Sequence, residues 1–239
     1  MAVDIDACIL ISAGAEWRSF LPHFDHLKLT TAPYGDYFNK RVHGHRIVIF
    51  HSGSGKVAAA GSTQYAIDQW KPKCLINLGT CGGFLGHAKR GEIFLAEKTI
   101  IYDIIEQMSD QDQAIERYTV SMDWSILPEE LPQNVTLAPI LSADRDILLG
   151  DIPGLIQKYH ASVADWESGA ISWIAQKNQI PCLILRAVSD LVDINNGEAY
   201  DDYAFFENQC QHIMANFALH LPQWLDILLE KQSKRHRKG

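Results

Sequence analysis

Three features are missing from the sequence: long apolar runs, a leader pattern and paired cysteines. No apolar run reaches the roughly 18 residues that a membrane-spanning helix needs. The chain does not begin with a basic segment followed by an apolar one, so we expect no secretory signal. The five cysteines are odd in number, and neither CxxC nor HExxH spacing occurs. We therefore expect a cytoplasmic protein with reduced cysteines, no disulfide framework, no metal site and no membrane partner.

Basic residues are outnumbered by acidic ones. Lys and Arg total 21 against 29 Asp and Glu, which gives a net charge of −8. This balance argues against nucleic acid or an anionic membrane as the main partner. The exception is the basic end "KQSKRHRKG" (231–239), which we expect to be a disordered, solvated tail. The length of 239 residues, without linker or repeat, fits a single domain over 1–230.

Short apolar runs alternate with helical patterns along the chain. The runs predict strands at 7–13, 46–52, 74–79, 92–100, 136–143 and 182–188. Helices are predicted at 55–71, 151–159 and 166–177, and from about residue 202 onward, where Pro222 should break or kink the last one. Near-continuous apolar strands are typical of buried sheets. The pattern predicts a three-layer α/β/α sandwich around a central mixed, mostly parallel sheet.

Polar or glycine-rich clusters follow four of the predicted strands, at 12–18, 52–56, 79–83 and 186–190. In an open α/β sheet, ligands bind where the carboxyl ends of strands converge. The sequence therefore predicts one cleft that these four clusters share. The irregular segment 103–135 is expected to be a long excursion near the functional surface.

The stretch "HSGSGKVAAAG" (51–61) resembles two phosphate-binding motifs without matching either. Phe50 stands where a P-loop has its first glycine, and Val57 follows Lys56 where Ser or Thr is required. Ala58 replaces the third glycine of a dinucleotide fingerprint. What remains is a strand, a turn and a helix start, which presents N–H groups to a polar or anionic group or forms only a tight turn.

Two further strand ends carry candidate chemistry. "NLGTCGGF" (77–84) places Cys81 in a cysteine version of the nucleophile elbow, at a predicted turn, and Asp190 followed by His212 or His220 would complete a triad. "FLGHAKRGE" is a poor start for the helix that an elbow requires, so we favour a packing role for the thiol.

Glu16 and Arg18 follow the first strand, either as ligand-binding groups or as exposed charges of a first helical turn.

Four motifs occur together in this order: "SGSGKVAAA", "INLGTCGG", "DWESGAI" and "LRAVSDLVD". In this order and spacing they resemble the nucleoside phosphorylase/nucleosidase superfamily, and they are most similar to its 5′-methylthioadenosine/S-adenosylhomocysteine nucleosidases. The likeness extends over roughly 8–230 and is weakest in 101–150 and after 194. It implies a nucleoside phosphorylase-like fold, a small-molecule nucleoside substrate, no cofactor, and a homodimer or higher homo-oligomer.

The resemblance also implies roles for the two carboxylates near the end of the chain. Asp190 would protonate the leaving purine, and Glu167 would hold the ribose hydroxyls and stabilise positive charge on the sugar. Glu16 would activate the attacking water. The further candidate substrate-binding residues are Trp166 (in place of a methionine), Thr80, Ser189, Arg186, Gly82 and Ser54.

Departures from the family's pattern concern the base and the 5′-group. Asp146, in "SADRDI", occupies the place of an aromatic residue against adenine, and Gly14 and Ser54 replace apolar residues near the 5′-sulfur. A substrate with a larger or more polar 5′-group is therefore an open alternative.

The acceptor has two candidates. Gly14 to Arg18 has the G-x-x-x-R spacing of a phosphorylase's phosphate turn, but Asn77 stands where a second phosphate arginine is needed, so we favour water. A non-catalytic nucleoside-binding protein is a further alternative, as is a purely structural pairing of the two carboxylates with Arg186.

Overall fold

The computed structural model describes residues 4–125 and 127–235. The strands are β1 (Ala7–Ile11), β2 (Thr30–Thr31), β3 (Asp36–Val42), β4 (His45–His51), β5 (Cys74–Phe84), β6 (Ile93–Ile101), β7 (Val120–Ser121), β8 (Thr136–Ser142), β9 (Val163–Asp165) and β10 (Cys182–Val192). The helices are α1 (Gly14–Phe20), α2 (Lys56–Trp70), α3 (Gln111–Glu116), α4 (Ile152–Tyr159), α5 (Ser168–Lys177) and α6 (Tyr203–Arg235), with short 3-10 turns at Leu21–His23 and Leu149–Asp151. Every predicted strand and helix is present.

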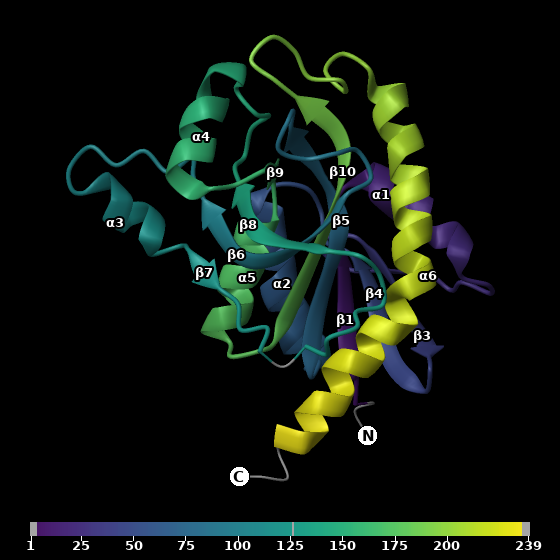
Figure 1. Ribbon diagram of the computed structural model, residues 1–239. Coiled ribbons are helices and arrows are strands. Elements are labelled where there is room, and N and C mark those ends of the chain that lie inside the picture. Colours follow the sequence, from purple (N-terminus) through teal and green to yellow (C-terminus); the bar gives the residue numbers. More distant parts are fainter. Residues whose placement is uncertain (1–3, 126, 236–239) are drawn as a thin grey trace.

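The strands form one mixed sheet in the order β10-β6-β8-β9-β5-β1-β4-β3-β2 (Figure 1). Because β10 also pairs with β5, the strands β5, β9, β8, β6 and β10 close into a ring. Parallel pairings join β1 to β4 and β5, β5 to β10, and β8 to β6 and β9. Antiparallel pairings are equally frequent among the described strands, so the expected mixed sheet is confirmed although its parallel pairs are not in the majority.

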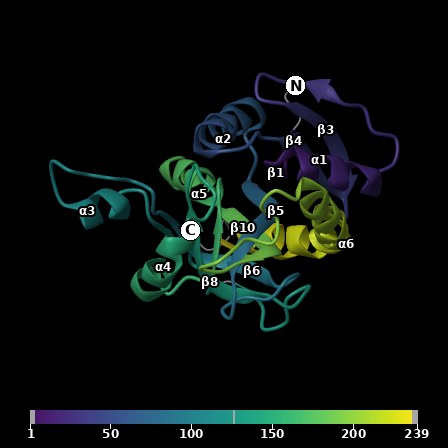
Figure 2. The same ribbon diagram turned by 90° about the horizontal axis from the view of Figure 1, so that it is seen from above.

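Helices cover both faces of the sheet, which gives the predicted layers (Figure 2). Alternate residues of β1 show the division: Ile9 and Ile11 pack with α1 and α6, whereas Cys8 and Leu10 pack with α2 and α5. This alternation follows from the two-residue period of a strand. Trp224 of α6 is buried in the first of these clusters. Helix α6 runs through Pro222, so the proline does not end it, and the helix bends along its length in Figure 1.

Two predicted strand ends lie further along the chain than expected. Strand β5 continues to Phe84, so 79–83 is extended backbone and not a turn. Strand β10 continues to Val192, with an irregularity in its pairing between Val188 and Asp190. The two strands extend together because they pair with each other along this length. An elbow at Cys81 is therefore wrong.

The segment 103–135 contains α3 and β7, and α3 projects from the body of the molecule in Figure 1. None of the described residues of 103–135 lines the cavity reported below, so the expected place of this segment at the functional surface is not found among them. Helix α6 extends to Arg235, into the expected tail, and residues 236–239 lie outside the described part of the chain. No helix in the described ranges is long and apolar enough to cross a membrane.

Candidate active site

A cavity of about 870 Å³ opens where β1, β5 and β10 end and where α6 begins. It brings together most of the residues that the sequence analysis singled out: Gly14, Glu16, Ser54, Thr80, Gly82, Trp166, Glu167, Ser189 and Asp190. Asp146 also lines it, on the loop after β8. Arg186 is fully buried behind this wall, and Arg18 lies outside the cavity. The predicted convergence of strand ends is therefore found.

Glu16 sits in the first turn of α1 with its carboxylate buried beneath the cavity wall. The backbone N–H of Ala13 donates to Oε2 at 3.0 Å. Thr80 of β5 donates twice to Oε1, from its backbone N–H at 2.6 Å and from its hydroxyl at 2.8 Å. Three donors stabilise the ionised carboxylate and fix its direction. Of the two alternatives for Glu16, the exposed helix charge is the wrong one.

Arg186 of β10 is the cation at the centre of the site. Its Nε lies 2.5 Å from Oδ2 of Asp165, and both side chains are 1% exposed. Its Nη2 donates to Oδ1 of Asn77 at 2.6 Å. Asp165 also accepts from the hydroxyl of Ser142 at 2.6 Å and from Ser168. A buried ion pair is tolerable only when such bonds satisfy its remaining polar atoms.

Gly79 explains how the arginine approaches Glu16. A Cβ at this position would stand 2.3 Å from Nη1 of Arg186 and 2.8 Å from Oε1 of Glu16. Only glycine fits, because any other residue would collide with both side chains. Nη1 is buried and has no hydrogen-bond partner among the described residues. A cationic donor and a carboxylate thus face the same point above β5.

Glu167 is the residue immediately before α5. Its Oε1 accepts the backbone N–H of Gly55 at 2.9 Å, and its Oε2 lies 3.9 Å from Nη2 of Arg186. Burial raises the pKa of Glu167 to about 8, with help from the charge of Asp165, and this outweighs the opposing effect of Arg186. Of the two interpretations of the turn at 52–56, the one in which it presents an N–H to a polar group is found, and that group is the carboxyl of Glu167.

Asp190 lines the cavity beside the irregularity in β10, and it pairs with Gly82, three residues further along β5 than Gly79, the partner of Arg186. Ser189 donates its hydroxyl to Oδ1 of Asp190 at 2.6 Å and lies 3.2 Å from the carbonyl of Cys81. Burial raises the pKa of Asp190 above its ordinary value, and the charges of Glu198 and Asp146 act in the same direction. The carboxyl can therefore carry a proton at a higher pH than an exposed aspartate can.

Two candidates from the sequence are not part of this constellation. The exposed guanidinium of Arg18 pairs with Glu207 at 2.5 Å and with the hydroxyl of Tyr203 at 3.3 Å. Cys81 of β5 contributes to the cavity wall but is buried, and burial raises the pKa of its thiol well above the usual range. Neither His212 nor His220 of α6 lines the cavity, so the described residues hold no cysteine triad.

Several lining residues escaped the sequence analysis. Asp165 was missed as the partner of Arg186, although it stands only two residues before Glu167. Arg145 follows the strand end at β8 and pairs with Asp151 at 2.8 Å. Tyr200, Tyr203 and Phe206 enter from the loop before α6 and from its first turn. In the sequence, only their position just beyond the "SDLVD" motif indicated that these residues could belong to the site.

The sequence profile of the phosphorylase superfamily matches residues 20–134. A 5′-methylthioadenosine/S-adenosylhomocysteine nucleosidase of Aeromonas salmonicida is 24% identical over 192 residues, which are 74% of this chain and 81% of that protein. These matches confirm the resemblance to the phosphorylase superfamily that was drawn from the four motifs.

Solved structures of this superfamily share the fold. A Helicobacter pylori 5′-methylthioadenosine/S-adenosylhomocysteine nucleosidase, solved with butyl-thio-DADMe-Immucillin-A, superposes with a TM-score of 0.76 at 17% identity, covering 92% of this chain and 99% of that one. Futalosine hydrolase of Helicobacter pylori has a TM-score of 0.75 at 18% identity, covering 92% and 98%. At this identity the likeness establishes the fold alone.

Proposed function

We propose that the protein is a nucleosidase, which hydrolyses the N-glycosidic bond of a purine nucleoside of the 5′-methylthioadenosine/S-adenosylhomocysteine type to free base and a ribose derivative. One observation supports this above others: a single cavity holds a protonatable carboxyl, Asp190, apart from two buried glutamates, Glu16 and Glu167. Cleavage of a C–N glycosidic bond needs a proton at the leaving base and negative charge near the sugar. The placement of Asp190 apart from Glu16 and Glu167 supports this division, and we call the two parts of the cavity the base end and the sugar end.

The proposed reaction assigns each proton. Asp190 donates its proton to the purine as the bond from C1′ to nitrogen breaks, so the base leaves as a neutral molecule. Glu167 accepts from the ribose hydroxyls and stabilises the positive charge that builds on the sugar ring. Trp166, Ser54 and Gly82 form the remaining contact surface around the nucleoside.

Water is the proposed acceptor. Glu16 takes a proton from a water molecule whose oxygen then bonds to C1′, and Nη1 of Arg186 and the hydroxyl of Thr80 orient that water. This assignment is supported by the buried, unpartnered Nη1, which lies across Gly79 from the Glu16 carboxylate. A base must lie within hydrogen-bond reach of the proton that it removes, and a molecule held between these groups satisfies that condition.

Phosphate fits this cavity poorly. Arg18 lies outside it, and Asn77 is already bonded to Arg186. The lining cation Arg145 is paired with Asp151, while carboxylates dominate the wall. A dianion would face uncompensated negative charge, so the phosphorylase alternative and the Gly14–Arg18 turn as a phosphate site are both disfavoured.

The substrate is proposed as a nucleoside without a 5′-phosphate. The acidic wall that disfavours inorganic phosphate would also repel a nucleotide. The relatives named for 5′-methylthioadenosine, S-adenosylhomocysteine and futalosine define the substrate panel to be tested. Asp146 adds an acceptor at the base end and favours a base with N–H donors on its exposed edge. Assembly as a homodimer or higher oligomer and a cytoplasmic location stay predictions.

The test is a product assay on this panel. Free base is separated by chromatography, with and without millimolar phosphate, and the reaction is repeated in ¹⁸O-labelled water. We expect free base, a free ribose derivative carrying one ¹⁸O at C1′, and an unchanged rate when phosphate is absent. Glu16→Gln should lower this rate by at least about 10²-fold. Formation of a sugar 1-phosphate would establish the phosphorylase instead, and tight binding without turnover would establish a nucleoside-binding protein.

A further inference from the structure

Beside the cavity, but outside its wall, lies a cluster of three charged residues from three elements. Lys56 is the first residue of α2, Asp103 follows β6, and Asp144 follows β8. The ammonium of Lys56 pairs with the carboxylate of Asp103 and lies 3.9 Å from Oδ2 of Asp144. The side chains of Lys56 and Asp103 are only 19% and 15% exposed. Such a sheltered pair is screened far less by water and salt than a surface ion pair.

Backbone hydrogen bonds complete the cluster. The N–H of Lys56 donates to Oδ1 of Asp144 at 2.6 Å, and the N–H of Asp144 donates to Oδ2 of Asp103 at 2.9 Å. Asp103 therefore holds a side chain on one element and the backbone of another. The start of α2 is tied in this way to the ends of β6 and β8, and we call Lys56, Asp103 and Asp144 the clamp.

The adjacent residue connects the clamp to the cavity. Gly55 has φ of 85° and ψ of 160°, a conformation open almost only to glycine, and its N–H donates to Glu167 at 2.9 Å. A Cβ on Gly55 would lie 3.1 Å from Oδ1 of Asp144. The clamp holds the next residue, Lys56, at both its N–H and its side chain. By fixing Lys56, it also fixes the direction of the neighbouring N–H of Gly55.

The clamp is needed because the start of α2 is locally unfavourable. A lysine at the first residue of a helix places a cation at the positive end of the helix dipole. Gly55 has no side chain with which to cap the N–H of Lys56. The two aspartates compensate both deficits. If the ammonium were removed, Asp103 and Asp144 would face each other without a cation, and their repulsion would displace the turn.

We propose that Lys56 is a positioning residue: through the clamp it orients the N–H of Gly55, which in turn holds Glu167 against the ribose. The inference rests on the proposed function for the role of Glu167. Lys56 itself touches no substrate, since it does not line the cavity. It acts on the sugar end of the reaction through one backbone hydrogen bond.

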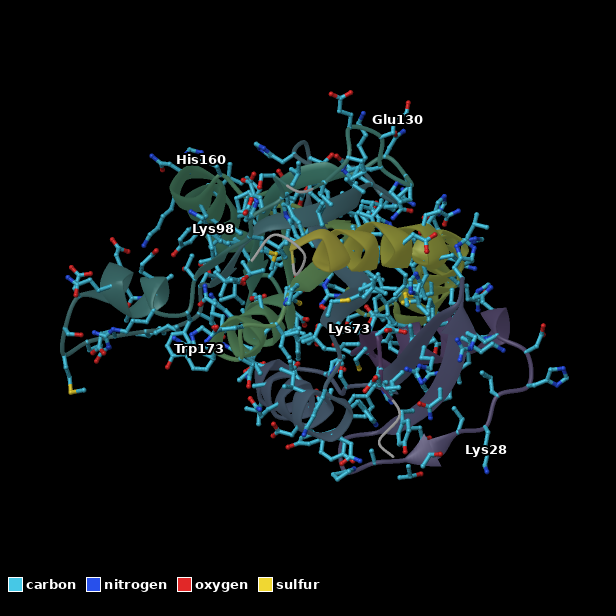
Figure 3. All side chains as sticks on the ribbon, turned by 90° about the horizontal axis from the view of Figure 1, so that it is seen from below. Lys28, Lys73, Lys98, Glu130, His160 and Trp173 are labelled. Carbon is cyan, nitrogen blue, oxygen red and sulfur yellow. The ribbon has the colours of Figure 1, made fainter. Side chains whose placement is uncertain are left out.

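The kinetic experiment compares Lys56→Met with two controls. Methionine keeps much of the side-chain length without the charge, whereas Lys56→Arg restores a cation. Lys73→Met removes a more exposed ion pair, 2.7 Å from Asp6, at the opposite end of β5 on the side seen in Figure 3, and controls for the loss of a lysine charge away from the cavity. We expect Lys56→Met to lower kcat/KM for ribonucleosides by about 10- to 100-fold, as expected for a misplaced catalytic group. For 2′-deoxynucleosides the loss should be smaller, Lys56→Arg should recover most of the rate, and Lys73→Met should leave it unchanged.

A second readout does not depend on activity. The carboxyl carbon of Glu167 is followed by ¹³C NMR across pH and assigned with Glu167→Gln. The Gly55 hydrogen bond lowers the pKa of Glu167, so its loss in Lys56→Met should move this titration upward, while the charges of Asp165, Glu16 and Arg186 stay in place. Asp144→Ala, at a half-exposed side chain, serves if Lys56→Met does not fold.

The outcomes separate the two proposals. If the wild-type protein cleaves no nucleoside, the proposed function fails, yet the titration still reports on the clamp. If Lys56→Met and Asp144→Ala retain both the Glu167 titration and the discrimination between the two sugars, the clamp does not position Glu167 and the inference is overturned.

Discussion

The two ends of the cavity hold their carboxyl groups in different ways. At the sugar end, Glu16, Asp165 and Glu167 surround one fully buried arginine, and each accepts hydrogen bonds from fixed donors. At the base end, Asp190 accepts one hydrogen bond, from the neighbouring Ser189, among the described residues. The sugar end is therefore a network of charged groups, whereas the base end has one carboxyl with a single hydrogen-bond donor, which we call the lone acid.

This difference matches two separate chemical tasks. A network of mutually compensating charges does not reorganise during a reaction, so it can stabilise a cationic sugar at little cost. A buried carboxyl with a single hydrogen-bond donor, near the acidic Asp146 and Glu198, is poorly stabilised as an anion, so it keeps its proton more readily and can donate it. Environments that push the ionisation of neighbouring carboxyls apart are a general means of assigning acid and base roles. The predictions below test this contrast between the two ends.

The largest effect is expected at the lone acid. Asp190→Asn retains the shape of the side chain and the bond to Ser189 but cannot supply a proton, so kcat should fall by about 10²- to 10⁴-fold. This corresponds to roughly 3–5 kcal/mol of activation free energy. Steady-state kinetics and a thermal melt of the same sample provide the measurement. A folded variant within a few-fold of wild type would remove Asp190 from the reaction.

A smaller and sugar-specific effect is expected within the network. Glu167→Gln keeps an acceptor for the N–H of Gly55 but cannot ionise to a carboxylate as positive charge builds on the sugar, so kcat/KM for ribonucleosides should fall by about 10- to 100-fold. Nucleosides without the 2′-hydroxyl should lose less, because part of their contact with Glu167 is already missing. The ratio of the two losses is the quantity to measure, and equal losses would mean that Glu167 maintains structure without contacting the sugar.

The lone acid was easier to predict from the sequence than the network. Asp190 and Glu16 follow apolar strands, and strand ends converge in this type of fold, so their placement in one cleft was predictable. The role of Asp165 was not predictable, because β9 spans only Val163–Asp165 and the sequence there resembles the segment before a helix. A three-residue strand has too little pattern to recognise, and its partner Arg186 is distant in the sequence.

Tertiary pairing accounts for the remaining differences. Gly79 and Gly82 predicted a turn, but β10 pairs alongside and keeps the chain extended through both of them. Glu16 and Arg18 stand two residues apart in α1 and therefore point to opposite sides of the helix. The burial of Phe20, four residues after Glu16, shows which side of the helix faces the interior. Local propensity could not determine either outcome.

The network should also make stability depend on pH. Glu167 has a pKa of about 8 in the folded protein against an ordinary 4.5, so the native state keeps a proton that the unfolded chain releases within this window. The stabilisation is complete below the unfolded value and is lost as the pH rises toward the folded value. The Tm of the wild type minus that of Glu167→Gln should therefore fall by about 4–10 °C between the two ends of the window.

Differential scanning calorimetry across this pH range provides the measurement, and the subtraction removes the titration of other groups. A difference in Tm that stays flat or rises with pH would show that Glu167 is ionised in the folded protein at neutral pH. The sugar end would then carry one more fixed negative charge than the contrast between the two ends assumes.

The smallest effect is expected at Arg18, which belongs to neither end. Its guanidinium is exposed and engaged by Glu207 and Tyr203, on the outer side of α1. To bind phosphate in the cavity it would have to leave both partners, turn past the helix and approach Glu16, which would repel the dianion. Arg18→Ala should therefore change kcat/KM by less than about 3-fold, with phosphate absent or at millimolar levels, whereas Arg18→Lys should be indistinguishable from wild type. A rate that rises with phosphate in the wild type, and loses that dependence in Arg18→Ala, would place the arginine at the sugar end and make phosphate the acceptor.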